Sequence, residues 1–517
     1  MCTWRAPLVR HTDPQLDQEK YRPPQTTPPT TNHTACYLPR RDCECPLPSS
    51  STTRLLHHYG QHTSIMKAAA ALSILCCASP TDAFAMVTSL PKPTVAGAAK
   101  APPVFKKDFT LPMGIPEESI AGVVDVLRSG RINRYSASSA EASQVAQLEQ
   151  ELVDFTGRGE GPGVKYALGV NSCSSAILIA LLSVGVKSGD EVLSNAFTFT
   201  AVPSAILRIG GKPVLVECEN SWGMDLDDLE KKAASSTAKV LLLSHMRSKA
   251  SIDHHMCDMD RLYEICDKHG LTVVEDCAHA LGVNWRGTQL GNRAKVAAYS
   301  CQSDKLINSG EGGFLTTNDE ELFSKAIYMS GCYEMRYGKH SVRGSDELME
   351  KAMLSERNLS VRMTEMTAAV IRPLLANLPE RVAQFHRRYQ EVVGILEEQV
   401  PDLVEVPKPL EHASVVGDHL NFHLVNPTEE ENKAFQQAKT KEMGVPLNWL
   451  RSPVNARYHV NWRGYGGPVQ DLPATDAALA TAYDLKLPPH FDDEDFAHLA
   501  KIIAYAARMT VRAGGEE

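Results

Sequence analysis

The sequence lacks any excess of positive charge. Its 517 residues include 53 lysines and arginines against 62 aspartates and glutamates, which gives a formal net charge of −9. It also lacks a stripe of basic residues interleaved with aromatic side chains, the usual footprint of a surface that binds nucleic acid. These two absences exclude nucleic-acid binding as the principal function class. A chain of this length, with 43% hydrophobic and 22% charged residues, is typical of a globular protein with two or more domains.

Thirteen cysteines are present, but no two of them form a CxxC pair. Seven, between Cys173 and Cys332, lie mostly in apolar runs, where a small buried thiol is the ordinary state. The neighbours His254 and His255 and the histidines in residues 419–423 have no third or fourth ligand at a defined spacing. Residues 419–423 alternate in polarity, which predicts a strand with one polar face. We therefore expect neither a disulfide framework nor a metal ion.

The first 108 residues lack the periodic apolar pattern of a folded domain. Residues 1–65 are rich in proline, threonine, histidine and arginine, so we expect them to be disordered and to be an extension of the gene model. Residues 66–108 start at Met66 with one positive charge, a short apolar stretch and the ending "DAFA", followed by a linker. This layout is typical of a targeting signal and is too short to span a bilayer. It predicts a bipartite plastid presequence and no membrane segment in the mature protein; the alternative is an untargeted, cytoplasmic protein.

From about residue 109, strand-like and helix-like segments alternate along the chain. This rhythm predicts βαβ units and a largely parallel sheet with helices on both faces. One predicted pair is the strand ending at Asp276 followed by a helix over residues 278–282. Near residue 370 the pattern changes to a long helix, short strands and a final helix. We expect an α/β fold with a large domain over residues 109–370 and a smaller C-terminal α+β domain over residues 371–517.

Small and aromatic residues follow two of the predicted strands, and ligands of open α/β sheets bind at the carboxyl ends of the strands. Cys173 and Ser174 begin a helix directly after one strand. The free N–H groups and the dipole of a helix start favour phosphate, although capping alone would also explain these residues. Phe199 follows the next strand, where an aromatic residue is most often part of the core.

Two further strand ends carry ionisable residues. Glu275 and Asp276 end an apolar strand, and a buried carboxylate there needs a partner because an unpaired buried charge is costly. Lys305 lies 29 residues after Asp276, with Ser300 before it and the turn "GEGG" after it. Taken alone, Lys305 would be an ordinary surface lysine.

The order of these features predicts a pyridoxal phosphate (PLP) site. In such a site a lysine forms a Schiff base with the cofactor, and an acid holds the proton of the pyridinium ring. A helix start holds the phosphate, and an aromatic side chain stacks on the ring. The candidate lysine, acid and aromatic are Lys305, Asp276 and Phe199.

The chain resembles the DegT/DnrJ/EryC1/StrS family of fold-type-I, PLP-dependent sugar and cyclitol aminotransferases. The resemblance covers residues 110–510 and is found in "SGRINRY", "GVNSCSSAILIALLSVGVKSGDEVLSNAFTFTA", "VVEDCAHALG", "SCQSDKLINSGEGG" and "RMTEMTAAV". Within the family, "QSDKLINSGEGG" is most similar to the glutamine-dependent scyllo-inosose branch, which makes aminocyclitols.

The resemblance implies roles for seven residues. It makes Lys305 the Schiff-base lysine and proton carrier, Asp276 the partner of the ring nitrogen and Phe199 the residue stacked on the ring. The other four contact the rest of the cofactor: Cys173, Ser174 and Ser300 hold the phosphate, and His279, where the family more often has Gln, lies near the phenolic oxygen.

The activity implied by the resemblance is transfer of an amino group from glutamine or glutamate to a keto-sugar, usually nucleotide-linked, or to a keto-cyclitol. The implied assembly is a homodimer with sites between subunits. One alternative is a PLP-dependent dehydratase, whose relatives replace the Schiff-base lysine with histidine. Others are a lyase or aldolase of the same fold, and a catalytically silent PLP-binding regulatory protein.

Two departures from the family pattern bear on the substrate and on activity. Ser360 occupies a position where the family usually has an Asn that reaches the phosphate of the neighbouring subunit. The segment after His245 is several residues longer than usual, and Ser248 replaces an expected glycine.

Overall fold

The computed structural model describes residues 100–246, 256–303, 305–408, 410–414, 416–436, 440–465 and 470–511. These residues belong to one compact unit, Val95–Glu517. The predictions for residues 1–65 and for the targeting signal lie outside the described residues, as do His254, His255 and Ser248. They stay predictions, and so does the domain division at residue 370.

The fold is built around a seven-stranded sheet with the order β1-β9-β8-β5-β4-β2-β3. β9 pairs antiparallel with β1 and β8, and the remaining neighbours pair in parallel. The predicted α/β fold with a mostly parallel sheet is thus confirmed. The strands are β1 (Tyr166–Val170), β2 (Glu191–Asn195), β3 (Lys212–Val216), β4 (Val240–Ser244), β5 (Thr272–Asp276), β8 (Val296–Ser300) and β9 (Gly313–Thr317).

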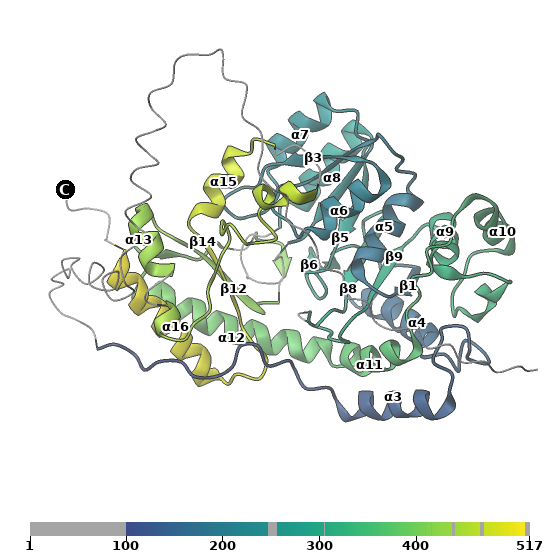
Figure 1. Ribbon diagram of the computed structural model, residues 1–517, viewed down its shortest axis with the longest axis horizontal. Coiled ribbons are helices and arrows are strands. Elements are labelled where there is room, and N and C mark those ends of the chain that lie inside the picture. Colours follow the sequence, from purple (N-terminus) through teal and green to yellow (C-terminus); the bar gives the residue numbers. More distant parts are fainter. Residues whose placement is uncertain are drawn as a thin grey trace, which may run out of the picture. The chain divides into compact units, whose positions relative to one another are not determined.

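Helices cover both faces of this sheet, as a mostly parallel sheet requires because its strands are apolar on both sides (Figure 1). Side chains of α4, α7, α8 and α11 form one hydrophobic core with the sheet, and those of α5, α6, α9 and α10 form another on the opposite face. These helices are α4 (Gln144–Thr156), α5 (Cys173–Ser183), α6 (Ala201–Ile209), α7 (Leu226–Ser235), α8 (Met259–His269), α9 (Glu320–Gly331), α10 (Asp346–Ser355) and α11 (Glu365–Ala376).

Local sequence explains where most of these elements begin and end. α4 starts after Ser143, whose side chain accepts a hydrogen bond from the Ala146 N–H, and it ends at the predicted glycine, Gly157. One predicted helix is absent: residues 278–282 form turns instead. Five residues make little more than one helical turn, and the N–H of Ala278 bonds the side chain of Asp276, which favours a turn.

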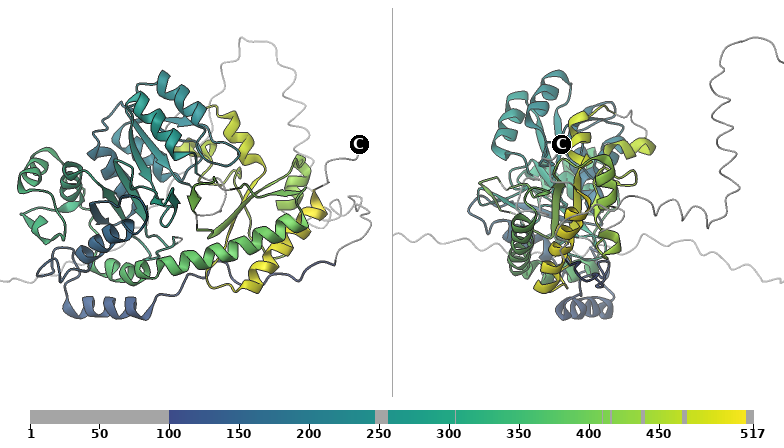
Figure 2. Two further views of the ribbon diagram at one scale, coloured as in Figure 1. Left: turned by 180° about the vertical axis from the view of Figure 1, so that it is seen from behind. Right: turned by 90° about the vertical axis from the view of Figure 1, so that its left-hand side faces the viewer.

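The C-terminal part has a separate four-stranded antiparallel sheet with the order β10-β12-β14-β13. The long helix α12 and the final helix α16 lie side by side against it and share its hydrophobic core (Figures 1 and 2). This is the smaller α+β part expected from the sequence. Its elements are α12 (Leu378–Gln399), β10 (Val404–Glu405), β12 (His419–Leu424), α13 (Glu429–Ala434), α14 (Thr440–Glu442), β13 (Asn448–Trp449), α15 (Pro473–Ala480), β14 (Ala482–Lys486) and α16 (Asp493–Thr510).

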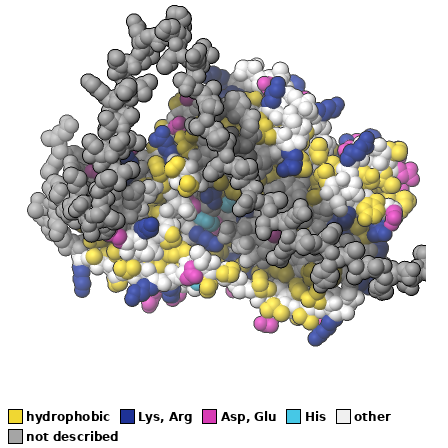
Figure 3. Space-filling view, in the orientation of Figure 1, with side chains coloured by type: hydrophobic (Ala, Val, Ile, Leu, Met, Phe, Trp, Pro, Cys, Tyr) yellow, Lys and Arg dark blue, Asp and Glu magenta, His cyan; other side chains and the backbone are white. Residues whose placement is uncertain are grey.

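Three short strands and one outer helix complete the fold. The strands form a small sheet with the order β11-β6-β7, and α3 is fixed to α11 by a hydrogen bond from the Ser119 hydroxyl to the Val370 carbonyl. No helix in the described ranges has the length and apolar character needed to cross a membrane. On the face shown in Figure 3, acidic and basic side chains are interspersed over the described surface. The bounds are α3 (Glu117–Ser129), β6 (Asn284–Trp285), β7 (Thr288–Gln289) and β11 (Ala413–Ser414).

Candidate active site

A cavity of about 430 Å³ lies at the carboxyl ends of the main-sheet strands, between that sheet and the C-terminal sheet. Its position is the one where open α/β sheets bind their ligands. All seven residues predicted from the sequence line it, although they come from four different strand ends. They are Cys173, Ser174, Phe199, Asp276, His279, Ser300 and Lys305.

One end of the cavity is formed by the start of α5. Ser172 caps this helix by accepting a hydrogen bond from the Ser175 N–H at 3.1 Å, and Cys173 is the first helical residue. A Cβ atom at Gly313 on β9 would lie 2.5 Å from the Cys173 backbone nitrogen, so only glycine permits this close approach. The helix start is thereby held against the sheet, with its positive end at the cavity, as an anion such as phosphate requires.

Asp276 is the last residue of β5 and is 6% exposed. Its Oδ1 atom accepts hydrogen bonds from the Ala278 N–H at 3.1 Å and from the Cys173 thiol at 3.7 Å. Its Oδ2 atom accepts a hydrogen bond from the Ser244 hydroxyl at 2.9 Å. The carboxylate is therefore held in one orientation at the wall of the cavity, where it can face the ring nitrogen of a bound cofactor.

Lys305 lies in the turn between β8 and β9, with its Nζ atom 2.8 Å from Nε2 of His279. His279 is 7% exposed and belongs to the turn that follows β5. The glycines after Lys305 have a structural reason, because Gly310 and Gly312 adopt φ angles of +78° and +148°. These backbone conformations strain other residues, so the "GEGG" turn brings the chain directly from the lysine into β9.

The two aromatic residues after β2 lie in different surroundings. Phe197 is fully buried in a hydrophobic cluster, whereas the side chain of Phe199 lines the cavity and is 46% exposed. Regular strand alternation would place these two residues on the same face, but the chain bends at residues 196 and 198 after β2 ends, so their side chains point in different directions. An exposed ring at the cavity wall is available to stack on a planar cofactor, and that role of Phe199 stays a prediction.

The thiol of Cys173 is a hydrogen-bond donor in this site. Burial, followed by the charge of Asp276, raises the pKa of this thiol well above its usual value. The protonated form is therefore favoured, and it is the thiolate that acts as a nucleophile. Cys173 thus supports Asp276 and the helix start and is not suited to attack a substrate.

These residues fit the chemical groups of PLP. The start of α5, whose close approach to β9 depends on the missing Cβ of Gly313, and the Ser300 hydroxyl can hold the phosphate. Asp276 can hold a proton on the ring nitrogen, and Lys305 supplies the amine. The donor set agrees with the cofactor predicted from the sequence.

Glu275 and Asp276 are consecutive residues of β5, so their side chains point to opposite faces of the sheet. Glu275 accepts hydrogen bonds from Nε2 of His245 at 2.7 Å and from the Tyr263 hydroxyl at 2.6 Å. Burial opposes ionisation of Glu275, but these hydrogen bonds outweigh burial and lower the pKa of the carboxyl below its usual value. Glu275 is the buried partner that holds β4 and α8 to β5.

His245, Glu275 and Cys277 form a group of three residues that could bind a metal ion. The ligand atoms of all three lie within 4.8 Å of one another. Hydrogen bonds account for this arrangement without an ion, since Glu275 already binds His245 and the Cys277 thiol lies 3.8 Å from its Oε2 atom. Burial raises the pKa of the Cys277 thiol well above its usual value, which disfavours the thiolate that a metal would need.

We expect Glu275→Ala to lower the free energy of unfolding by about 3–5 kcal/mol at pH 7, because it leaves His245 and Tyr263 buried without their partner. The folded pKa of Glu275 lies below its value of about 4.5 in the unfolded chain, so its contribution is complete above that pH and is lost as pH falls through the folded pKa. Urea unfolding of both proteins should therefore give curves that converge in acid. The control is Glu230→Ala, which removes an exposed ion pair with Lys268 and should change little; equal effects of the two changes would contradict the prediction.

The far wall of the cavity comes from the C-terminal part, and sequence reasoning missed it. The residue pairs His419 with Lys486 and Asn421 with Asp484 are neighbours across β12 and β14. The strand at residues 419–424 is confirmed, and all six of its residues are buried. Its polar side chains lie under other parts of the protein, which the local pattern does not reveal. The wall residues are His419, Asn448, Arg457, Asp484 and Lys486.

Ser360 does not line the cavity in the described chain. It is exposed, adopts a left-handed backbone conformation with φ of +57°, and its hydroxyl accepts a hydrogen bond from Arg362 at 2.9 Å. Arg362 also donates to the Gly331 carbonyl at 2.8 Å. Of the lengthened segment after His245, residues 247–255 lie outside the described part of the chain.

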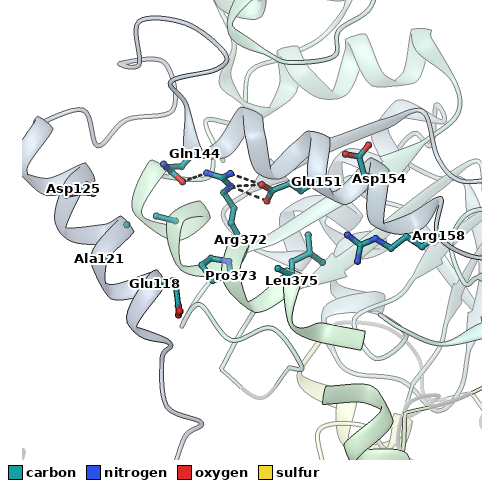
Figure 4. A pocket seen from close by; sticks show the side chains of 13 residues that line it. Glu118, Ala121, Asp125, Gln144, Glu151, Asp154, Arg158, Arg372, Pro373 and Leu375 are labelled. Carbon is teal, nitrogen blue, oxygen red and sulfur yellow. Dashed lines mark hydrogen bonds and ion pairs between the residues drawn. The ribbon is translucent and has the colours of Figure 1, made fainter. Parts of the chain in front are cut away.

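A second hollow, of about 750 Å³, lies between α3, α4 and α11 and contains none of the predicted site residues (Figure 4). Arg372 of α11 crosses it and donates to both oxygens of Glu151 on α4, at 2.7–3.1 Å, and to the side chain of Gln144 at 2.7 Å. This charge pair joins the two helices. Although it is larger, the hollow has no grouping of catalytic residues comparable with the strand-end cavity.

Comparison with known proteins gives matches over nearly the whole described chain. A model of the DegT/DnrJ/EryC1/StrS aminotransferase family matches residues 114–504. The chain is 30% identical over 358 residues to GDP-perosamine synthase of Escherichia coli O157:H7, covering 66% of this chain and 90% of that protein. It is 30% identical over 231 residues to a candidate L-glutamine:3-amino-2,3-dideoxy-scyllo-inosose aminotransferase of Streptomyces kanamyceticus, covering 44% and 51%. The crystal structure of 3-amino-5-hydroxybenzoic acid synthase superposes with a TM-score of 0.63 at 25% identity, covering 79% of this chain and 100% of that one.

Proposed function

The chain belongs to the DegT/DnrJ/EryC1/StrS aminotransferase family, and on this premise we propose that it moves an amino group from glutamine or glutamate to a keto-cyclitol or a nucleotide-linked keto-sugar. It is a PLP-dependent aminotransferase, like the family and its structural neighbours. The identities of the donor and the acceptor, and the roles of the individual residues, are what we propose.

The observation that supports this proposal most is the composition of the strand-end cavity. It brings together one lysine from the β8–β9 turn, one carboxylate from the end of β5 and the positive end of α5. Each of these groups is common in proteins. Their convergence on one cavity of about 430 Å³ is what aminotransfer with PLP requires.

When bound, PLP supplies an electron sink that stabilises negative charge at the substrate carbon from which a proton is removed. The residues of this chain supply the rest. Lys305 would hold or move that proton at its Nζ atom, and His279, 2.8 Å away, would orient the amine. Asp276 would keep a proton on the ring nitrogen through its opposite charge, while the start of α5 and Ser300 would bind the phosphate.

The substrate proposal rests on the relatives and on the cavity wall. One relative is named for a GDP-linked sugar and another for glutamine and an inosose, so both acceptor classes are retained. The wall formed by β12, β13 and β14 adds basic, acidic and amide side chains opposite Lys305. Such a polar wall suits acceptors with several hydroxyl groups and a donor with a carboxylate.

The test is a matrix of donors and acceptors. Purified enzyme loaded with PLP is mixed with glutamine, glutamate or alanine, and loss of the cofactor's visible absorbance is recorded. Keto-cyclitols and UDP-, GDP- or dTDP-linked keto-sugars are then added, and return of the absorbance identifies the acceptor. We expect glutamine or glutamate to react far faster than alanine and one acceptor class to complete the cycle. An enzyme that binds PLP but responds to no donor would contradict the proposal and favour the silent regulatory alternative.

The dehydratase alternative is less well supported than aminotransfer. Dehydratases of the family replace the Schiff-base lysine with histidine, whereas this chain keeps Lys305 at the cavity. The same experiment separates the two reactions, because a dehydratase would release water from the sugar without net transfer of nitrogen. Mass spectrometry of the product with ¹⁵N-labelled donor distinguishes them.

We also propose a homodimer whose sites lie between the subunits. The exposed Phe199 at the cavity and the exposed apolar side chains of Tyr333 and Met335 are consistent with a surface that is covered in the assembly. Sedimentation should give twice the mass of the 56.6 kDa chain at micromolar concentration. A stable monomer with full activity would contradict this prediction.

A further inference from the structure

Two buried hydroxyl groups, those of Ser244 and Thr198, extend from Asp276 into the interior of the protein. Ser244 is the last residue of β4 and is 4% exposed, and Thr198, after β2, is fully buried. The Ser244 hydroxyl lies 2.9 Å from Oδ2 of Asp276, and the Thr198 hydroxyl lies 2.7 Å from the Ser244 hydroxyl oxygen. The three side chains form a continuous chain of hydrogen bonds from the interior to the cavity wall.

The chemistry of the groups sets the direction of this chain. A carboxylate accepts hydrogen bonds and has no proton to donate, so the Ser244 hydroxyl must donate to Asp276. A hydroxyl has one proton, which Ser244 has then used, so the Thr198 hydroxyl must donate to Ser244. Both donors therefore point their positive ends toward the carboxylate, and each bond strengthens the next.

The backbone holds Ser244 at this position. Its N–H donates to the side-chain oxygen of Asn195 at 2.7 Å, and Asn195 is itself buried. Ser244 is the direct neighbour of Asp276 in the parallel pairing of β4 with β5, and the N–H of His245 donates to the Asp276 carbonyl at 3.0 Å. The Ser244 hydroxyl is thus presented to Asp276 by two strands rather than by a flexible loop.

The Asp276 carboxylate accepts a hydrogen bond from the Ser244 hydroxyl at 2.9 Å, from the Ala278 N–H at 3.1 Å and from the Cys173 thiol at 3.7 Å, so the bond from Ser244 is the shortest of the three. The other two bonds end on Oδ1, so Ser244 is the one of these three donors that fixes Oδ2. Loss of this bond would leave Oδ2 free to rotate away from a bound ring and would remove a donor that stabilises the negative charge.

We propose that Ser244 and Thr198 are positioning residues, which act through Asp276 to keep the cofactor's ring nitrogen protonated. This rests on the proposed role of Asp276 as the partner of that nitrogen. The charged pair of pyridinium and carboxylate competes with a neutral pair in which the proton has moved to the carboxylate. Hydrogen bonds to the carboxylate favour the charged pair, so removing one shifts the population toward the unprotonated ring.

The test uses full-length enzyme loaded with PLP that carries ¹⁵N in the ring, because the ¹⁵N chemical shift reports protonation of this atom without turnover. Ser244→Ala should move the resonance toward the position of the unprotonated ring and slow the half-reaction with the amino donor by about tenfold, the effect of one hydrogen bond to a charged group. Ser194→Ala is the matched control. Ser194 is also a buried serine, on the neighbouring strand β2, but its hydroxyl donates to the Leu242 carbonyl at 2.9 Å, so this variant should match the wild type.

Asp276→Asn is the reference that separates this proposal from the proposed function. If Asp276→Asn moves the resonance and Ser244→Ala leaves it at the wild-type position, the positioning role is overturned while the role of Asp276 stands. If Asp276→Asn itself leaves the resonance unchanged, both are overturned. A shift in both variants with none in Ser194→Ala supports the proposal.

Thr198 provides a second, nearly isosteric test that keeps the packing. Thr198→Val removes the hydroxyl and should shift the resonance in the same direction as Ser244→Ala but by less, because it acts through one more bond. Thr198→Ser keeps the hydroxyl and should behave as the wild type. An unchanged resonance in Thr198→Val, with a shift in Ser244→Ala, would overturn the part assigned to Thr198.

Discussion

Replacing Lys305 by alanine is expected to slow amino transfer by about 10³-fold or more, because the variant loses both the amine that bonds the cofactor and the group that moves the proton. No rearrangement of neighbours restores that amine. His279 lies 2.8 Å from Nζ of Lys305, but an imidazole cannot form the same covalent link. Lys305→Arg should be as inactive, although it keeps a positive charge beside His279.

The cavity contains a second lysine, which makes the test specific. Lys486 at the end of β14 lines the same cavity from the opposite wall. Reduction of the loaded enzyme with borohydride, followed by peptide mapping, should place the pyridoxyl group on Lys305. Lys486→Ala should keep this label and should affect the binding of substrate more than the attachment of cofactor. A pyridoxyl group on Lys486 would show that the catalytic lysine is misassigned.

The second large effect is expected for Asp276→Asn, which should slow the half-reaction with the amino donor by about 10²–10³-fold, as loss of one preorganised electrostatic group does elsewhere. The side chain keeps its shape but loses the charge that favours a protonated ring nitrogen. Cofactor affinity should fall much less, because the start of α5, Ser300 and Lys305 are unchanged. Rapid mixing and a fluorescence titration measure the rate and the affinity separately.

Glu275→Gln is the matched control for this variant, since Glu275 is the adjacent residue of β5 and points to the opposite face. It should lower stability but leave the rate per folded enzyme close to that of the wild type. If Asp276→Asn reacts at nearly the wild-type rate, Asp276 is a structural carboxylate at a strand end. If both variants lose the same activity, the effect comes from distortion of β5.

Local sequence was sufficient to predict the α/β order and the residues at the strand ends. The strand before Asp276 and the strand before Lys305 are short apolar runs, and burial on both faces of a parallel sheet produces such runs directly. Because parallel strands end on the same edge, residues after four separate strands could be expected to meet. The resemblance to a family then assigned roles to them, and the cavity contains all seven.

Short-range sequence patterns predicted secondary structure and burial less well where local and tertiary effects compete. Residues 278–282 were expected to be helical but form turns, since a single turn of helix has too few hydrogen bonds to outweigh the bond from Ala278 to Asp276. The strand at residues 419–424 was predicted correctly, but its alternating polarity did not reveal that its polar side is buried as well. Alternation records the two faces of a strand and does not say what covers either face.

By itself, then, the sequence determined the alternation of strands and helices, the strand-end positions of Lys305 and Asp276, and the glycine turn after the lysine, because each depends on residues within one local segment. Tertiary structure alone decided the antiparallel direction of β9, the wall from β12 and β14, and the contacts of Ser244 with Thr198 and Asp276. These depend on pairing between segments far apart in the chain: Ser244 and Asp276 are 32 residues apart, and Thr198 and Ser244 are 46 apart. Such contacts form only when the whole sheet orders its strands, since the free energy that selects them comes from burial across the complete core and not from any single segment.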